Sequence, residues 1–152
     1  MKWIAQDVDL YSQSKEYVDT VLIPLCPLSL GTQMKQLASM YEFNTILTNE
    51  IERQFKGRLF LFPAATYFTD WTKEKKLEFI HEWTSKLSVD GVKHVFFITS
   101  DSEWKEIESE MEGTLIWSPY IPMDHVEDKY KRSMMEDQVK QLLHIFIQKW
   151  RQ

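Results

Sequence analysis

Four short apolar runs constrain the fold of this chain more than any other feature of its sequence. Each run is continuous rather than alternating between apolar and polar residues, which indicates a strand that is covered on both faces. Strands of this kind are typical of a parallel sheet that lies between helices. The runs span residues 21–23, 59–62, 95–98 and 115–117. They predict a small, mostly parallel sheet of four strands.

The segments between these runs have the spacing of amphipathic helices. Apolar side chains recur at three- and four-residue steps over residues 34–55, and the pattern returns over residues 77–87. A shorter helix is expected at 103–111, a last one at about 128–150 and a leading one at about 7–17.

Glycine and proline residues mark the expected ends of several of these helices and strands. Gly57, Gly91 and Gly113 each lie between a helical segment and an apolar run, where helices often end in a left-handed residue. Pro24 is expected to end the first strand early, because proline has no N–H to donate to a neighbouring strand.

The alternation of helices and strands predicts the fold class. Parallel strands linked by helices need right-handed crossovers, which place helices on both faces of the sheet. We therefore expect one α/β domain over residues 1–152, with three α/β/α layers, a mostly parallel four-stranded sheet and an additional N-terminal helix. The sequence favours the strand order 2-1-3-4 but does not decide it. This architecture corresponds to a Rossmann-like or flavodoxin-like half.

The charge of the chain argues against nucleic acid as a partner. The formal net charge is −5, and the lysines are scattered over predicted helices, as Lys73, Lys75 and Lys76 are. A nucleic-acid-binding protein usually carries a basic patch instead. No apolar signal segment follows Met1, and no stretch approaches the ~18 apolar residues that span a bilayer. With a single cysteine, Cys26, the sequence predicts a cytoplasmic protein without membrane insertion.

Polar side chains follow the carboxyl ends of the predicted strands, where open α/β sheets bind ligands. Their hydroxyl and carboxylate groups could bond a small molecule or exchange protons with it. Lysine, arginine and glycine-rich phosphate loops are missing from these segments, which favours a neutral or cationic ligand over a nucleotide. The candidate ligand-binding residues are Ser29, Thr66, Tyr67, Asp101, Tyr120 and Asp124.

Several of these positions have a structural alternative. Asp70, Asp101 and Asp124 could converge as magnesium ligands, but each also precedes a predicted helix, where aspartate commonly caps the first turn. Cys26 begins a Cys-Pro-Leu-Ser segment, which is either a weak redox motif or a buried thiol, and we favour the buried thiol. The histidines do not cluster, so the sequence predicts no metal site and no cofactor, and it does not decide whether the protein is an enzyme.

The last predicted helix has an unusually wide apolar face. Its apolar arc covers roughly 200°, about twice the ~100° that is usual for a surface helix. One interpretation is that the leading helix or an aromatic loop covers the extra width. The other is that this face binds a second copy of the chain or a partner protein. The candidate interface residues are Ile145, Phe146, Ile147 and Trp150.

Distinctive residues are concentrated in the N-terminal half of the chain. They are Met1-Lys2-Trp3, Asp7, Tyr11, residues 15–20, Ile23-Pro24-Leu25, Glu42-Phe43, Glu52-Arg53-Gln54 and residues 56–59. In these residues the chain resembles the YpiF-like family of bacilli, a domain of unknown function, and the likeness extends more loosely over the whole chain. The resemblance implies a cytoplasmic protein of a low-GC Gram-positive bacterium. It implies no activity, cofactor or catalytic residue.

Two functions of different classes follow from these observations. The first is a non-catalytic binding or accessory protein, which could form a homodimer through its last helix. The second is a small-molecule-binding enzyme or sensor that uses the polar residues at the strand ends. The expected partner is therefore either a protein or a small molecule, and the sequence does not identify it.

Overall fold

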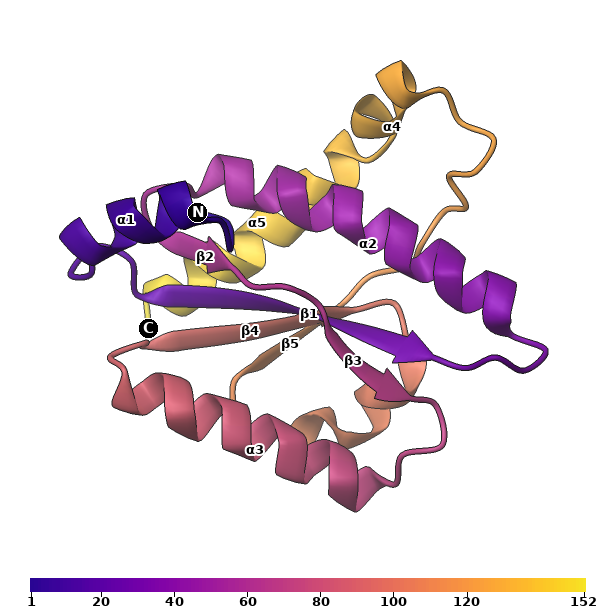
Figure 1. Ribbon diagram of the computed structural model, residues 1–152, viewed down its shortest axis with the longest axis horizontal. Coiled ribbons are helices and arrows are strands. Elements are labelled where there is room, and N and C mark those ends of the chain that lie inside the picture. Colours follow the sequence, from indigo (N-terminus) through magenta and orange to yellow (C-terminus); the bar gives the residue numbers. More distant parts are fainter.

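The computed structural model, which describes residues 1–152, has three layers around a parallel sheet (Figure 1). Every strand pair is parallel; the strand order is β2-β1-β4-β5, and β3 lies beside the second half of β1. The predicted α/β/α class is thus confirmed, and the four apolar runs have the order 2-1-3-4 that the sequence favoured without deciding it. The elements are α1 (Ala5–Gln13), β1 (Thr20–Leu28), α2 (Met34–Gln54), β2 (Leu59–Leu61), β3 (Ala65–Phe68), α3 (Lys73–Val89), β4 (His94–Thr99), the 3-10 helix η1 (Ser102–Glu110), β5 (Thr114–Trp117), α4 (Asp128–Met134) and α5 (Glu136–Trp150).

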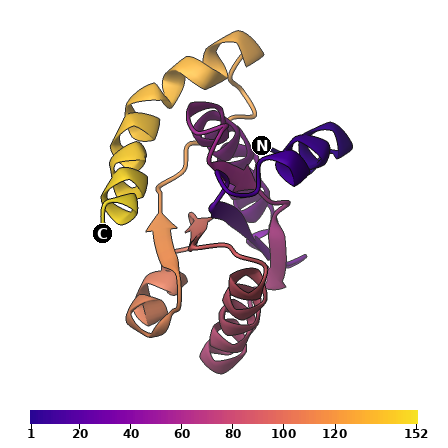
Figure 2. The same ribbon diagram turned by 90° about the vertical axis from the view of Figure 1, so that its left-hand side faces the viewer.

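Each face of the sheet buries its own core. On one face Phe43 of α2 and Phe146 of α5 pack with Phe96 of β4, and all three are fully buried. On the other face Ile80 of α3 and Trp104 of η1 cover the sheet. Figure 2 shows α2 and α5 on one side of the strands and α3 and η1 on the other. The apolar runs are continuous because both sets of alternate side chains enter a core.

The sheet has a fifth strand that the sequence did not predict. Residues 65–68 were expected in the loop after the second strand, but they form β3 beside β1. Leu22 pairs with Leu61, and Leu25 pairs with Ala65. Between these two pairs β1 advances by three residues, whereas the neighbouring segment advances by four. The extra residue acts as a β-bulge, which interrupts this outer strand at residues 62–64. We name residues 59–68 the β2–β3 edge.

Pro24 does not end β1, which continues to Leu28. The Leu28 oxygen accepts a hydrogen bond from Thr69 N at 3.2 Å, so the even-numbered residues of β1 direct their backbone groups toward the β2–β3 edge. The missing N–H of Pro24 therefore lies opposite the break at residues 62–64, where the ladder is already interrupted. Pro27 directs its nitrogen to the opposite side, beyond the last residue of β1 that pairs with β4.

The wide apolar face of α5 packs inside the molecule. Phe146 is fully buried, and Trp150 packs edge-on against Phe55 with ring centroids 4.7 Å apart. Ile145 and Ile147 are half-buried, and none of the exposed large apolar side chains belongs to α5. The sheet and α2 thus account for the wide arc within one molecule, and homodimerisation remains a prediction that needs another surface. Like the other helices, α5 is not both long and apolar enough to cross a membrane.

Candidate functional site

A cleft opens between α2 and η1 at the carboxyl ends of the strands. β1 and β4 are neighbours, but the chain leaves β1 through α2 on one face and leaves β4 through η1 on the other. Such a point of divergence is where open α/β sheets bind ligands. The cleft has a volume of about 420 Å³, and we name it the switch-point cleft. Its walls are Gln33, Gln36, Met40, Ser100, Asp101, Ser102, Glu103, Trp117, Pro119 and Tyr120.

Only two of the six predicted ligand-binding residues, Asp101 and Tyr120, line this cleft. Asp124 is an exposed residue outside the cleft, and its Oδ2 lies 3.9 Å from Lys35 Nζ and 3.4 Å from His125 Nε2. The structure therefore does not bring the six residues together in one pocket. No three His, Cys, Asp or Glu side chains gather where they could hold a metal ion.

Asp101 holds η1 against the sheet through two hydrogen bonds. Its Oδ1 accepts a hydrogen bond from Glu103 N at 3.1 Å, which caps the first turn of η1. Its Oδ2 accepts a hydrogen bond from the Tyr67 hydroxyl at 2.6 Å, and that hydroxyl accepts one from Trp104 Nε1 at 2.7 Å. The capping interpretation of Asp101 is confirmed by this geometry.

Tyr67 belongs to this buried network and does not line the cleft. Its side chain lies on the α3 side of the sheet and is 4% exposed. Burial raises the pKa of its hydroxyl far above the ordinary value, and the hydrogen bond to the Asp101 carboxylate raises the pKa further. The hydroxyl therefore stays protonated at neutral pH and serves as a fixed donor rather than as an acid or base.

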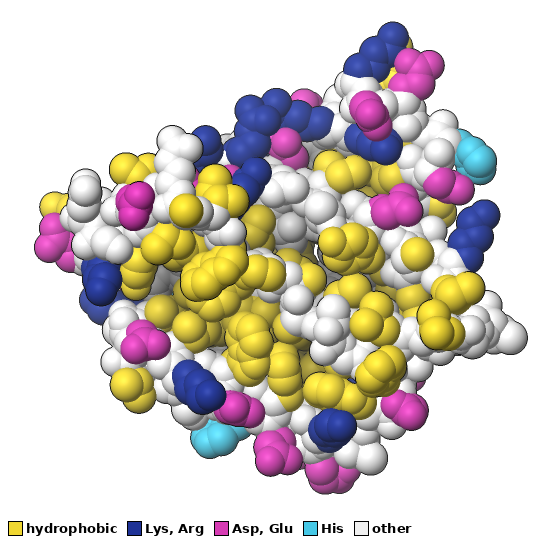
Figure 3. Space-filling view, viewed as in Figure 1, with side chains coloured by type: hydrophobic (Ala, Val, Ile, Leu, Met, Phe, Trp, Pro, Cys, Tyr) yellow, Lys and Arg dark blue, Asp and Glu magenta, His cyan; other side chains and the backbone are white.

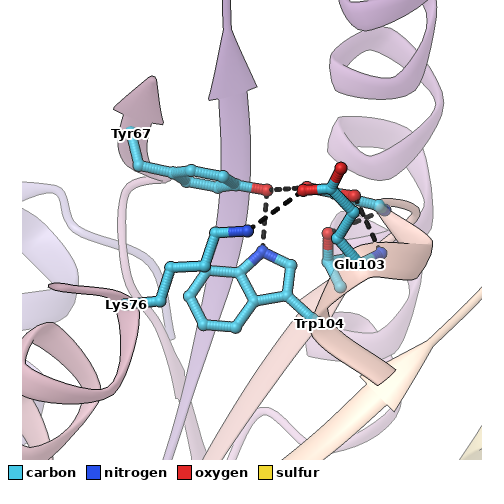
Figure 4. A network of polar contacts seen from close by, with 6 residues as sticks. Tyr67, Lys76, Glu103 and Trp104 are labelled. Atoms are coloured by element: carbon cyan, nitrogen blue, oxygen red, sulfur yellow. Dashed lines mark hydrogen bonds and ion pairs between the residues drawn. The ribbon is translucent and has the colours of Figure 1, made fainter. Parts of the chain in front are cut away.

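Lys76 of α3 joins the same network from below (Figure 4). Its sequence neighbours Lys73 and Lys75 are exposed, but Lys76 is only 5% exposed. Its Nζ lies 3.2 Å from Glu103 Oε2, and it lies 5.9 Å and 5.4 Å from the ring centroids of Tyr67 and Trp104. A buried ammonium needs an opposite charge or an aromatic face. Lys76 therefore ties α3 to η1 and is not part of a solvated face.

A second hollow on this side of the molecule is a groove with almost wholly apolar walls. It lies between β3, the end of β1 and the first half of α2, and its volume is about 610 Å³. Two of the predicted residues, Ser29 and Thr66, line this groove and not the switch-point cleft. No charged side chain lines it, and we name it the apolar groove. Its walls are Cys26, Leu28, Ser29, Leu30, Met34, Leu37, Ala38, Tyr41, Thr66 and Phe68.

Cys26 contributes to the wall of this groove but is itself 7% exposed. Burial raises the pKa of its thiol, which disfavours the reactive thiolate. The buried-thiol interpretation is therefore supported over the redox motif.

The groove is one end of a longer apolar surface (Figure 3). Phe62 packs on Trp3 with ring centroids 5.5 Å apart, and Phe62 and Tyr41 line a smaller hollow beside the break in the β2–β3 edge. Tyr41 also lines the groove, so the surface is continuous. Figure 3 shows hydrophobic side chains across this face, from α1 over the β2–β3 edge to the end of β3. We name Trp3, Leu28, Leu30, Met34, Tyr41, Phe62 and Phe68 the apolar band.

Sequence reasoning missed this surface because it placed residues 65–68 in a loop. The β-branched and aromatic side chains of Thr66, Tyr67 and Phe68 favour a strand, and that signal could have found β3. The exposure of Leu30 and Met34 had no such signal, since their sequence context is that of buried apolar residues.

Comparison with known proteins gives a family but no activity. The model of a family described as "Protein of unknown function (DUF2487)" matches residues 9–150. The chain is similar to "Uncharacterized protein YpiF" of Bacillus subtilis (strain 168), with 31% identity over 150 residues that cover 99% of this chain and 98% of the relative. No solved structure matches the chain. The resemblance to the YpiF-like family is thereby confirmed.

Proposed function

The chain belongs to the family described as "Protein of unknown function (DUF2487)", and because this membership implies no reaction, we propose from the structure that the protein is a non-catalytic accessory protein. Its task in this proposal is to bind a partner protein on the apolar band. The packing of the fold does not by itself explain why this band is exposed.

The exposure of the band is the observation that carries this proposal. Leu30 is 91% exposed and Phe68 is 61% exposed, while Leu28, Met34 and Tyr41 are 40% to 50% exposed. Single exposed apolar side chains are common, but a contiguous patch marks a binding surface. Burial of a fully exposed Leu or Phe side chain contributes roughly 1.5–3 kcal/mol, and the half-buried side chains of the band contribute less, so a partner that covers the band still gains a substantial free energy of binding.

The bonding of the polar residues fits a binding role. The Tyr67 hydroxyl donates a hydrogen bond to the Asp101 carboxylate, and together these two groups hold η1 in place. The Ser29 hydroxyl accepts a hydrogen bond from Gly31 N at 3.1 Å, within its own loop. Each of these groups thus has a structural task, whereas the exposed apolar side chains have none.

We place this binding in the cytoplasm. The one cysteine, Cys26, is buried and unpaired, which fits a reducing compartment. The formal net charge of −5 supports a protein partner over nucleic acid.

A comparison of variants tests the proposed function. Wild-type protein and the variants Phe68→Ser and Leu30→Ser would be used to capture proteins from an extract of the source bacterium. The captured partner would then be purified, and its Kd for each form measured by calorimetry. We expect each band variant to weaken binding about tenfold or more. The matched control is Tyr130→Ser, because Tyr130 is 52% exposed on α4, outside the band. A partner that binds both band variants as tightly as wild type would refute docking on the band.

A specific observation favours a second candidate function, small-molecule binding in the switch-point cleft. Asp101 and Tyr120 converge there with the amides of Gln33 and Gln36, and no lysine or arginine lines the walls. A neutral or cationic ligand fits this lining. Thermal-shift screening with metabolites would identify a ligand, since a specific ligand raises the Tm. Gln36→Ala should abolish that rise, and a ligand that stabilises this variant as strongly as wild type would place its site elsewhere.

A further inference from the structure

The outer side of β3 carries backbone groups that no other strand pairs. β3 pairs only with β1, and on that side Thr69 N donates to Leu28 O at 3.2 Å. Successive residues of a strand direct their N–H and C=O groups to opposite sides, so Thr66 and Phe68 direct theirs away from β1. The Phe68 oxygen accepts a hydrogen bond from Trp71 N at 3.1 Å. The N–H and C=O of Thr66 and the N–H of Phe68 therefore have no partner in the sheet.

The apolar groove lies beside these free backbone groups. The side chains of Thr66 and Phe68 line the groove on the α2 side of the sheet. A strand that paired with β3 would extend this side of the sheet, and every second side chain of that strand would face the groove. Leu30 and Met34 would meet those side chains, and because the walls carry no charge, apolar side chains fit there. Figure 1 shows β3 in front of β1, with no helix or strand covering it on the side that faces the viewer.

We propose that the protein recognises its partner by strand addition. An extended segment of the partner pairs with the free edge of β3 and places every second side chain, each apolar, in the groove. Backbone hydrogen bonds supply affinity in this mode of recognition, and the groove supplies specificity. This inference rests on the proposed function and defines the form of the ligand. The three free backbone groups of β3 suit a segment of about four or five residues.

Charge and size favour a segment of a partner protein over a second copy of this chain. Each copy carries a formal net charge of −5, so two copies repel each other. The free edge is short, because Pro63 precedes β3 and a turn at Asp70 follows it. A stable dimer buries about 1,200 Å² or more, whereas a short extended segment needs only this edge and the groove.

Peptide selection on the intact protein tests the inference. Random peptides would be displayed, selected on the wild-type protein and counter-selected on Phe68→Glu, whose far-UV circular dichroism must match wild type. The selected peptide would then be synthesised with single N-methyl groups. We expect N-methylation on the side that faces β3 to weaken binding about tenfold, and N-methylation on the other side to have no effect. Hydrogen exchange at Thr66 N and Phe68 N should slow by about tenfold or more when the peptide binds.

The remaining outcomes refute the inference in distinguishable ways. If the peptide needs Phe68 but neither N-methylation nor exchange at Thr66 responds, strand addition is refuted, while docking on the band stands. If no selected peptide distinguishes Phe68→Glu from the matched control Tyr130→Glu, strand addition is refuted and the partner measurements decide the proposed function. If sedimentation shows a wild-type dimer and a Phe68→Glu monomer, the occupant of the edge is a second copy and not a partner segment.

Discussion

Tyr67→Phe tests the buried network that fixes η1 against the sheet. The substitution removes one oxygen and keeps the ring, so it creates no large cavity. It deletes the hydrogen bond from the hydroxyl to Asp101 Oδ2, at 2.6 Å, and the one from Trp104 Nε1, at 2.7 Å. The first involves a carboxylate and contributes about 1.5–3 kcal/mol, while the second is neutral and contributes about 1 kcal/mol.

The burial of Trp104 raises the cost of this substitution. The side chain is 0% exposed, so its indole N–H would lose its only partner in a place that water does not reach. Leaving a buried donor unpaired costs about 1–3 kcal/mol, which overlaps with the bond that is lost. We therefore expect Tyr67→Phe to lower the free energy of unfolding by about 3 kcal/mol. For a chain of this size that corresponds to a fall in Tm of about 6–12 °C.

Urea unfolding followed by far-UV circular dichroism measures this loss, with an unchanged m-value as the sign that the unfolding transition is the same. Tyr41→Phe is the matched control, because Tyr41 is 50% exposed and its hydroxyl has no hydrogen-bond partner in the structure. We expect the control to change stability by less than about 0.5 kcal/mol. A loss below about 1 kcal/mol for Tyr67→Phe would refute the role of this network in holding η1.

Three further predictions concern the core, a turn and an ion pair. Phe146→Ala should lower stability by about 3–5 kcal/mol in urea unfolding, because the ring is fully buried, and should leave the sedimentation coefficient unchanged; dissociation of a dimer with little loss of stability would contradict this. Gly113→Ala should cost more than about 1 kcal/mol, since φ is 76° and a Cβ would lie 2.9 Å from a backbone oxygen. Gly57→Ala has open space and no positive φ, so it should not lower the Tm. Burial, the largest single influence, would raise the pKa of Asp19, but the hydrogen bonds from Arg58 and Thr20 and the positive charges of Arg58 and His94 together outweigh burial and lower it. The resulting stabilisation is complete above the unfolded pKa of about 3.9 and is lost as the pH falls through the lower folded pKa, so a plot of Tm against pH should be flatter for Asp19→Asn in that acid range.

The layered fold was predictable because its main signal is local. Leu22 and Ile23 are adjacent and both fully buried, yet Leu22 packs in the core under α2 and Ile23 in the core under α3. A strand with helices on both faces must show a continuous apolar run, and the sequence displays it directly. The order of the strands was not decided by this signal, because the connection rules allow several orders and only favoured 2-1-3-4.

The candidate site was only partly predictable because its residues depend on contacts between distant elements. Asp101 is a cap for η1 and also an acceptor for Tyr67, and the second role requires β3 to be in place. Lys76 resembles its exposed neighbours Lys73 and Lys75 in sequence, and only the docking of η1 buries it. Composition and periodicity report how apolar a segment is, but not which of its apolar residues remain uncovered.

The register of the β2–β3 edge connects the network to the groove. Leu61 and Phe68 both face the α2 side of the sheet, although an odd number of residue steps separates them. In an uninterrupted strand they would face opposite sides, because side chains alternate with a period of two. The extra residue at 62–64 reverses this alternation. Without it, Tyr67 would turn toward α2, away from Trp104, and Phe68 would leave the groove for the core under α3. One inserted residue therefore sets both the donor that fixes η1 and the exposed side chain that we expect a partner to cover.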